Sequence, residues 1–300
     1  MTQAADLNAR FGNAAVQIKD GPGGMPVVEV AYARATATIA LQGAHLTRFA
    51  PVGAKPVIWL SDAAKFAPGK SIRGGVPVCW PWFGPHESRG DVPAHGYARM
   101  VPWELVETRA LSNDATRLQF RLLETDATRV QWPHPCELTL QMTVGAALDL
   151  ELATRNTGKD AFTLGEALHT YFEVSDVRQI QVRGVENLAY IDKVAAGARK
   201  QQQGAVAIDG EVDRIYLNST ADCVIDDPQW RRRIRIAKTG SGATVIWNPG
   251  RDKADKMGDL GSDGYLRMVC VESANAADHV VRLAPGDTHR LSVRYSVEAM

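Results

Sequence analysis

The sequence predicts an all-β fold in which two large antiparallel sheets pack as a β-sandwich. Apolar residues alternate with polar ones along 118–122, 138–144 and 148–152. A period of two over such lengths is typical of antiparallel strands that bury one face. Many other apolar segments are short and are separated by Gly, Pro and Asn turn signals. Short strands with frequent turns favour a sandwich or barrel over alternating strands and helices.

The first part of the chain is expected to form strands after a short lead-in. The segment up to Ala15 is weakly apolar, and the sequence leaves open whether it is a short helix or a loose terminus. Residues 21–24 and 51–56 carry turn signals. The intervening segments are rich in Val, Thr and Ile, and the expected strands are 27–30, 35–41, 45–49 and 57–60.

The middle of the chain is expected to contain two hairpins and a bent segment. Residues 145–147 are predicted to join two of the alternating strands, and 156–160 to form a second hairpin turn. The segment 162–174 is predicted to be a strand pair or a bent strand centred on His169. Two further elements are expected here, a short strand at 177–182 and a polar edge hairpin within 193–210.

The last third is expected to complete both sheets. The segment 230–236 places three Arg on one face and two Ile on the other, with acidic residues at 226–227 nearby. We interpret the Arg face as a solvated strand face rather than an anion-binding or nucleic-acid-binding patch. The strand 266–272 is apolar and is expected to be central, and 251–261 can hold one short helix. The other expected strands are 213–217, 221–225, 244–247, 280–283 and 290–297, with a turn at 284–287.

Composition and charge favour a globular cytoplasmic protein. The chain has 300 residues, 45% of them hydrophobic, and a formal net charge of zero. Bulk charge gives no reason to expect a nucleic-acid or membrane-surface partner, and no apolar run is long enough for a membrane helix. The start of the sequence lacks the pattern of a secretory signal. The four cysteines are widely spaced, without a CxxC pair, so we expect reduced thiols.

The domain organisation is predicted to be simple. No composition break marks a linker, and no internal repeat of 20 to 50 residues is present. We therefore expect one domain over residues 1–300, with 1–24 as an N-terminal lead-in. A monomer is expected because no exposed apolar stripe stands out.

The segment 71–104 is the most unusual stretch of the sequence. It contains three of the seven Trp residues and five Pro, but no sustained period of 2 or 3.6. Recurrent Pro and Gly break regular ladders, whereas the aromatic content is too high for disorder. Long ordered loops are usually functional. We expect this segment to line a pocket, with Arg73, His95 and Arg99 as its polar groups and Trp80, Trp82 or Phe83 as either an apolar floor or core.

Three residues are candidates for ligand contact or acid–base chemistry. His95 lies beside Gly96, where a ligand can approach the backbone, and the alternative is a structural His bonded to a loop carbonyl. His169 lies among apolar neighbours, so it is either a core residue or a positioned acid. Glu272 ends the apolar run 268–272, where a carboxylate is costly to bury unless it is paired or used. Its alternative is a surface position at a strand end.

Arg73 and Arg99 are candidates for an anion clamp, because a guanidinium group binds phosphate in a bidentate manner. No HxH, HExxH or closely spaced Cys cluster is present, so we expect no metal. A GxSxG elbow, a P-loop and a GxGxxG motif are also missing from the sequence, which argues against the commonest hydrolase and nucleotide-binding sites.

Six blocks taken in order resemble one known family. They are IRGGVPVCWPWFGPH, HGYARMVPWE, ALHTYFEVSD, DRIYLN, VIWNPG and VCVESAN, and the similarity covers about residues 25–297. Together they resemble the glucose-6-phosphate 1-epimerases, which are hexose-6-phosphate mutarotases of the aldose 1-epimerase superfamily. The resemblance implies a large antiparallel β-sandwich of the galactose mutarotase type. It also implies interconversion of the α and β anomers of a hexose 6-phosphate without a cofactor.

The resemblance also assigns roles to residues. The family's catalytic His and Glu fall on His169 and Glu272, its substrate contacts fall on Arg73, Arg99 and Asp213, and His95 lines the sugar site. The sequence departs from the family at two positions. Ala94 stands where a sugar-binding Gln is frequent, which leaves the preferred hexose phosphate open, and Gly250 replaces a Trp that often follows Asn-Pro.

Two alternative functions are compatible with the same residues. One is a non-catalytic protein that binds a sugar phosphate on the same scaffold. The other is a glycosidase or lyase, for which Asp213 and Glu272 could supply the two carboxylates. The presence of both a candidate acid and a candidate base favours the epimerase over the binding protein.

Overall fold

The computed structural model describes residues 4–111 and 114–300, and two eight-stranded antiparallel sheets form most of it. The first sheet carries the candidate site. Its strands, from one edge to the other, are β15 (Ala198–Gln201), β14 (Ala189–Asp192), β16 (Val212–Leu217), β19 (Ala243–Asn248), β20 (Met268–Asn275), β11 (Glu166–Leu168) and β5 (Val78–Cys79). A further strand, β12 (Tyr171–Glu173), also pairs with β20.

The second large sheet contains the strands with the clearest alternation. Their order is β13 (Gln181–Arg183), β17 (Cys223–Asp227), β18 (Arg232–Thr239), β22 (Thr288–Ala299), β9 (Leu148–Asn156), β8 (Cys136–Val144), β7 (Ala115–Leu122) and β6 (Trp103–Leu111). Every second side chain of β8 and β9 is buried, as the period of two predicts. Arg233 and Arg235 of β18 form ion pairs with Asp226 and Glu298, so the Arg face of this strand is a solvated one.

The remaining elements are smaller. A four-stranded sheet contains β1 (Val16–Asp20), β2 (Pro26–Ala31), β3 (Ala35–Ala40) and β4 (His45–Pro51), and β10 (Phe162–Leu164) pairs with β21 (Val281–Leu283). The helices are α1 (Ala4–Phe11), α2 (Asp126–Gln131) and α3 (Gly250–Ala254). Short 3₁₀ turns are η1 (Pro22–Gly24), η2 (Ala98–Met100), η3 (Val177–Gln179), η4 (Gly264–Leu266) and η5 (Ala277–His279).

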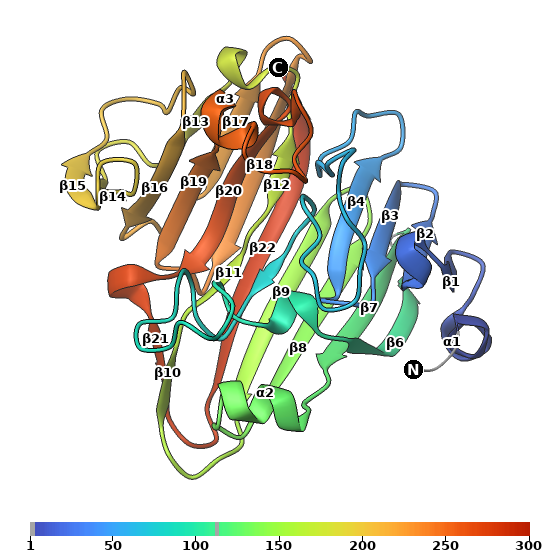
Figure 1. Cartoon of the computed structure of the whole chain (residues 1–300). Coiled ribbons are helices and arrows are strands. Elements are labelled where there is room, and N and C mark those ends of the chain that lie inside the picture. The colour runs from blue at the N-terminus through green and yellow to red at the C-terminus, as the bar shows by residue number, and fades with distance from the viewer. Residues whose placement is uncertain (1–3, 112–113) are drawn as a thin grey trace.

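One large apolar cluster joins the sheets. Figure 1 shows β1–β4 beside the β6–β9 end of the second sheet, while β14–β16 lie at the opposite side of the molecule. The cluster includes Phe49 of β4, Phe120 of β7, Leu140 of β8 and Tyr216 of β16, each 1% exposed or less. The sheets therefore pack as the β-sandwich that the sequence predicts.

Three sequence-based assignments are wrong in detail. Residues 156–160 do not form a hairpin turn, because β8 and β22 already occupy both edges of β9, so the chain leaves this sheet and β10 pairs with β21. Residues 57–60 make only isolated bridges, Ile58 to Phe172 and Leu60 to Gly74. Residues 177–182 begin as the turn η3, which starts where the Asp176 carboxylate accepts the Arg178 backbone N–H.

Several elements had no sequence-based assignment. The helix α2 is short, but Thr125 and Thr128 form a reciprocal capping box at its start. The strand β1 lies within the lead-in that we assigned to 1–24, and it pairs with β2. The segment before Ala15, left open as helix or loose terminus, contains α1.

Candidate active site

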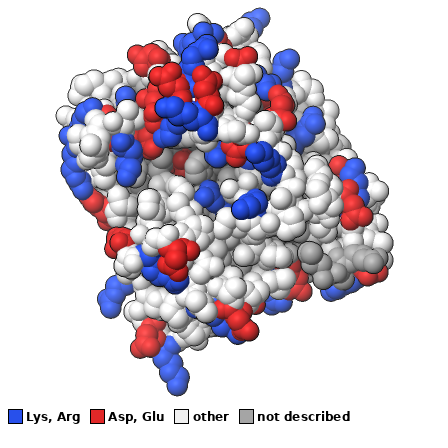
Figure 2. Space-filling model, viewed as in Figure 1, with Lys and Arg blue, Asp and Glu red and all other residues white. Residues whose placement is uncertain are grey.

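A cavity of about 580 Å³ lies over the first sheet. Strands β14, β16, β19 and β20 provide one wall, and the loop segment 71–99 provides the other. Figure 2 shows this hollow near the centre of the face in view, with basic side chains around it. The six candidate residues all line this cavity: Arg73, His95, Arg99, His169, Asp213 and Glu272.

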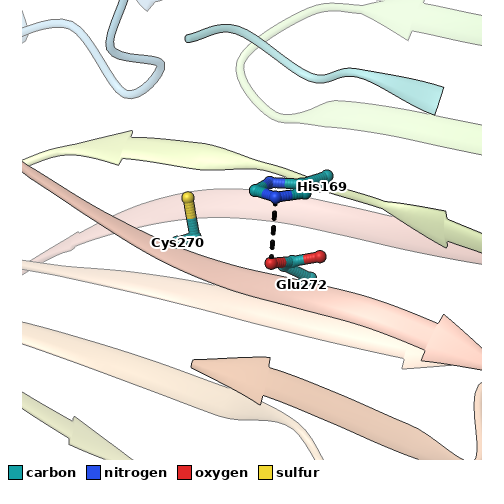
Figure 3. A group of neighbouring side chains, drawn as sticks. All are labelled: His169, Cys270 and Glu272. Atoms are coloured by element: carbon teal, nitrogen blue, oxygen red, sulfur yellow. Dashed lines mark ion pairs between the residues drawn. The ribbon is translucent and has the colours of Figure 1, made fainter. Parts of the chain in front are cut away.

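His169 and Glu272 form an ion-pair contact at the cavity wall, with 3.3 Å between Nε2 and Oε1. Glu272 belongs to β20, a central strand of the first sheet. His169 occupies the break between β11 and β12, where pairing with β20 is interrupted, and its backbone N–H bonds to the carbonyl of Pro77 in register with the β11–β5 pairing. This bend is the bent strand that the sequence predicts. It turns the imidazole toward the carboxyl group of the neighbouring strand (Figure 3).

Burial governs the ionisation of this pair. Glu272 is 1% exposed, and desolvation raises its pKa well above the ordinary value, with a further contribution from the Asp213 charge. Desolvation lowers the pKa of His169, and the nearby His95 and Arg99 lower it further. Both effects favour the neutral forms of the two groups. In these neutral forms the pair holds one proton that the carboxyl oxygen and the imidazole nitrogen can exchange.

Aromatic contacts fix the orientation of His169. Its imidazole stacks on the ring of Tyr171, with a centroid distance of 5.0 Å and an interplanar angle of 14°. The ring of Trp247 lies on another side, with a centroid distance of 6.1 Å and an interplanar angle of 74°. A ring held on two sides keeps its nitrogen aimed at Glu272, which is the pre-organisation that proton transfer requires.

His95 lies on the opposite wall in a left-handed backbone conformation, with φ of 65°. Its Nδ1 accepts the backbone N–H of Gly84, and the edge of its ring meets Phe83. Because Nδ1 accepts, the neutral imidazole carries its proton on Nε2. Burial lowers its pKa to about 3, with Arg99 and Arg73 adding to the effect. His95 is therefore a neutral hydrogen-bonding group at pH 7.

Arg73 is held in place by two contacts and keeps other donors free. Its Nε donates to Asp259 Oδ1 at 3.1 Å, and its NH1 donates to the Tyr171 hydroxyl at 3.0 Å. The backbone carbonyl of Gly74 accepts from Nε2 of the buried His45 at 2.8 Å, which secures the turn after Arg73. The NH2 group remains available to a ligand.

Arg99 reaches the cavity from η2, and its NH2 donates to the carbonyl of Ala94 at 2.9 Å. Position 94 thus contributes its backbone to the site, whereas its side chain is only a methyl group. Asp213 lies across the cavity on β16, near Lys193 and Lys253. Burial raises the pKa of Asp213, and the two Lys oppose this shift.

The aromatic residues of 71–104 divide between cavity and core. Phe83 lines the cavity, whereas Trp80 and Trp82 are 1% and 9% exposed and belong to the main core.

Sequence analysis missed four polar residues of the site, which are Tyr171, Lys193, Lys253 and Asp259. Tyr171 follows His169 by two residues and could have been found from the bent strand. Lys193 follows the end of β14, Lys253 belongs to α3 and Asp259 lies in a loop, and only the tertiary fold brings these three to the site.

The architecture that carries this buried carboxyl–imidazole pair is the galactose mutarotase-like fold. A galactose mutarotase-like protein from Clostridium acetobutylicum shares the fold, with a TM-score of 0.72 at 14% identity over 96% of this chain and 100% of that chain. The sequence profile described as Aldose 1-epimerase matches residues 26–296.

Closer relatives agree with this class. A candidate glucose-6-phosphate 1-epimerase of Escherichia coli strain K12 is 38% identical over 255 residues, which are 85% of this chain and 84% of that protein. The crystal structure of a candidate mutarotase (YeaD) from Salmonella typhimurium has a TM-score of 0.90 at 34% identity, and the match covers 96% of this chain and 95% of that chain. The chain belongs to the aldose 1-epimerase family, whose enzymes interconvert sugar anomers.

The family resemblance inferred from the six sequence blocks is therefore confirmed, as is the β-sandwich that it implies. None of the helices formed by the described residues has the length and apolar character needed to cross a bilayer.

Proposed function

We propose that the chain interconverts the α and β anomers of a hexose 6-phosphate, with glucose 6-phosphate as the preferred substrate. The observation that carries the proposal is the His169–Glu272 contact of 3.3 Å in a cavity that also presents Arg73 and Arg99. The acid–base pair serves anomerisation, and the guanidinium groups suit a phosphate. The names of relatives from Escherichia coli, Salmonella typhimurium and Cenchrus ciliaris, at 34–38% identity, support the same substrate.

Anomerisation needs two proton transfers. One proton leaves the C1 hydroxyl and another reaches the ring oxygen, so that the ring opens to the aldehyde. Rotation about C1–C2 and reclosure then give the other anomer. In our proposal Glu272 accepts the proton from O1 and protonated His169 donates to O5, and the roles exchange on reclosure. Two such groups contribute on the order of 10² to 10⁴-fold each.

His169 and Glu272 together hold the same number of protons without substrate as in the proposed reacting form. Burial favours a protonated carboxyl and a neutral imidazole, whereas the proposed reacting form has carboxylate and imidazolium. Because the total charge is unchanged, sugar hydroxyls need only move one proton between the two groups. Contacts between those hydroxyls and the carboxylate stabilise the charged form.

The substrate would lie between the two walls of the cavity. Arg73 and Arg99 would bind the 6-phosphate, remote from C1, and this binding would position the anomeric carbon against Glu272. Asp213 would accept hydrogen bonds from sugar hydroxyls, and His95 would donate one from Nε2. The Ala94 side chain cannot form a hydrogen bond. We therefore expect fewer contacts to the sugar than in family members that have Gln at this position.

The proposal is tested by NMR exchange spectroscopy on glucose 6-phosphate at anomeric equilibrium, with glucose and galactose as comparison sugars. Accelerated exchange of the phosphorylated sugar alone supports both the reaction and the role of Arg73 and Arg99. Accelerated exchange of all three sugars would support the proposed reaction but would contradict a preference for the phosphorylated sugar. If no sugar exchanges faster while glucose 6-phosphate still binds, the protein is a binding module and the proposal is wrong.

We also propose that the chain acts as a cytoplasmic monomer with a single domain over residues 1–300. Its four cysteines carry free thiols, which suits a reducing compartment. Large exposed apolar side chains such as Val52, Val130 and Val194 come from separate segments of the sequence. Light scattering of the purified protein measures its molar mass in solution, and the mass of a dimer would refute the proposed monomer.

A further inference from the structure

Three different metal-binding side chains meet beside the cavity. The donor atoms of His169, Cys270 and Glu272 all lie within 4.8 Å of one another. Cys270 and Glu272 are two positions apart on β20, so both side chains leave the same face of the strand. Figure 3 shows the His169 ring above Glu272, with the Cys270 thiol beside them. The proposed acid–base reaction uses the imidazole and the carboxyl group but not the thiol.

The separations suit a tetrahedral Zn²⁺ ion. With bonds of about 2.0 to 2.1 Å to nitrogen and oxygen, two ligands of such an ion lie about 3.3 to 3.4 Å apart. The observed distance from His169 Nε2 to Glu272 Oε1 is 3.3 Å. A zinc-bound sulfur lies about 3.6 Å from the other ligand atoms, and the three donor atoms here lie within 4.8 Å of one another. His169 and Glu272 line the cavity, so a fourth position would face it.

The charges of the ligands also favour a cation. Glu272 is 1% exposed, and a carboxylate buried to this degree is costly unless a positive group pairs with it. A carboxylate and a thiolate together balance the two charges of Zn²⁺. Arg73 and Arg99 oppose a cation here, but Asp259 pairs with Arg73 and Asp213 faces the same cavity.

We propose that His169, Cys270 and Glu272 form a Zn²⁺ site whose occupation blocks anomer exchange. On binding, the Cys270 thiol loses its proton to solvent, the His169–Glu272 pair loses its one shared proton as well, and the metal takes the lone pairs of Nε2 and Oε1. Those lone pairs are then unavailable for proton transfer to and from the sugar. The metal site stands on the geometry alone, whereas its inhibitory effect rests on the function proposed above.

Direct binding is measured by titrating the wild-type protein with ZnCl₂ in a calorimeter, with MgCl₂ as the comparison. We expect one Zn²⁺ per chain and no Mg²⁺ binding, because thiolate and imidazole are poor ligands for Mg²⁺. Cys270→Ser should weaken Zn²⁺ binding at least tenfold. Cys223→Ser is the matched control, since Cys223 is also buried but lies in β17 of the other sheet.

Spectroscopy with Co²⁺ identifies the ligands without any substitution. A thiolate-to-cobalt charge-transfer band and tetrahedral d–d bands are expected for wild type and for Cys223→Ser, and the charge-transfer band is expected to disappear in Cys270→Ser. Failure of the wild-type protein to bind Zn²⁺, or a Co²⁺ complex without a thiolate band, would overturn the site. Equal Zn²⁺ affinity in wild type and Cys270→Ser would also overturn it.

The exchange assay then separates the two proposals. Zn²⁺ should reduce glucose 6-phosphate exchange at least tenfold in wild type, and Cys270→Ser in the same solutions should exchange without this loss. Chelation of Zn²⁺ should restore the wild-type rate. If Zn²⁺ binds through the thiolate but exchange continues, the inhibitory effect is wrong and so is the catalytic assignment of His169 and Glu272. If wild type catalyses no exchange, the calorimetry and the Co²⁺ spectra still decide the metal site.

Discussion

At the scale of single residues, the environment of each group decides its chemistry. At 169 the imidazole is shielded from solvent and contacts a carboxyl group, whereas at 95 it is a neutral ring whose Nδ1 accepts a hydrogen bond from a backbone N–H. His45 has a third role, since its burial lowers its pKa to about 4 and its Nε2 bonds the carbonyl of Gly74. Local sequence patterns singled out 95 and 169, and only the family resemblance separated their expected roles.

Glu272→Gln and His169→Ala should each lower the exchange rate of glucose 6-phosphate by about 10² to 10⁴-fold. Glutamine keeps the shape of the side chain but cannot take a proton, and alanine removes the imidazole. Both variants should retain most sugar-phosphate binding by calorimetry, because the phosphate contacts are remote from C1. A near wild-type exchange rate in either variant would remove that residue from the reaction.

Arg99→Ala should raise KM for glucose 6-phosphate by about 10- to 100-fold while changing kcat less. Hydrogen bonds to charged groups are worth about 1.5 to 3 kcal/mol, and this arginine would contact only the phosphate. Steady-state kinetics of Arg99→Ala measure this change in KM. Arg89→Ala is the control, because Arg89 pairs with Asp91 and does not line the cavity. An unchanged KM in Arg99→Ala would exclude it from phosphate binding.

At the scale of elements, the segment 71–104 is an ordered wall of the cavity held by close backbone contacts. Gly96 has φ of +69°, and its chain pairs with Trp80. A Cβ at this glycine would lie 1.9 Å from the Trp80 carbonyl oxygen. The glycine is therefore required both for its backbone conformation and for the space.

Gly96→Ala should destabilise the protein by about 1–3 kcal/mol from backbone strain alone, and more because of the overlap with Trp80. Its folded fraction should also lose activity, since His95 and Arg99 lie on either side of the glycine. Urea unfolding and exchange rates measure the two effects. Gly90→Ala is the matched control in the same segment, because nothing lies within 4 Å of its Cβ and its φ is ordinary. Equal stability of the two variants would contradict this account.

A buried ion pair links β22 to the first sheet. His289 Nε2 lies 2.9 Å from Oε1 of the fully buried Glu166, which also accepts from Asn275. The hydrogen bond to Glu166 raises the pKa of His289 above 6.5. The resulting stabilisation is fully present below pH 6.5 and is lost as the pH rises through the folded-state pKa.

The stability difference between wild type and His289→Gln should accordingly shrink with pH. We expect about 1.5 kcal/mol at pH 6 and less at pH 9, from urea unfolding at each pH. His134→Gln serves as a comparison, because His134 contacts Trp132 and Phe162 through its ring. A difference that grows with pH would mean that the neutral His289 is the stabilising form.

At the scale of the whole molecule, the net charge is zero but the charges are not evenly placed. Arg73, Arg99, Lys193 and Lys253 all line the cavity, against Asp213 and Glu272. A cleft lined by an excess of one sign attracts ligands of the opposite charge. Composition alone could not reveal this local excess.

We therefore expect kcat/KM for glucose 6-phosphate to fall about tenfold as ionic strength rises toward 1 M, where the Debye length is about 3 Å. The matched probe is a double substitution, Lys193→Gln with Lys253→Gln, which should flatten the salt dependence. The same measurements on the outer-face variant Arg235→Gln should follow wild type. A kcat/KM that is independent of salt would show that the rim charges do not assist binding.

The sequence by itself determined the two-sheet architecture and the six candidate residues that line the cavity. Alternation predicted β7, β8 and β9, because burial of one face imposes a local period of two that is visible in the chain. It missed α2, whose stability comes from a capping box and not from an apolar stripe, and it assigned a hairpin at 156–160 where β22 already occupies the edge of β9. Local patterns contain no information on which edges of a strand are already paired.

Only the tertiary structure decided which residues meet. Glu272 and His169 are 103 positions apart, and their 3.3 Å contact exists because β11 and β12 both pair with β20 and leave His169 in the break between them. Burial then shifts both pKa values in opposite directions and makes one proton common to the pair. Asp259, Lys193 and Lys253 join the site in the same way, since distance and desolvation are properties of the folded chain.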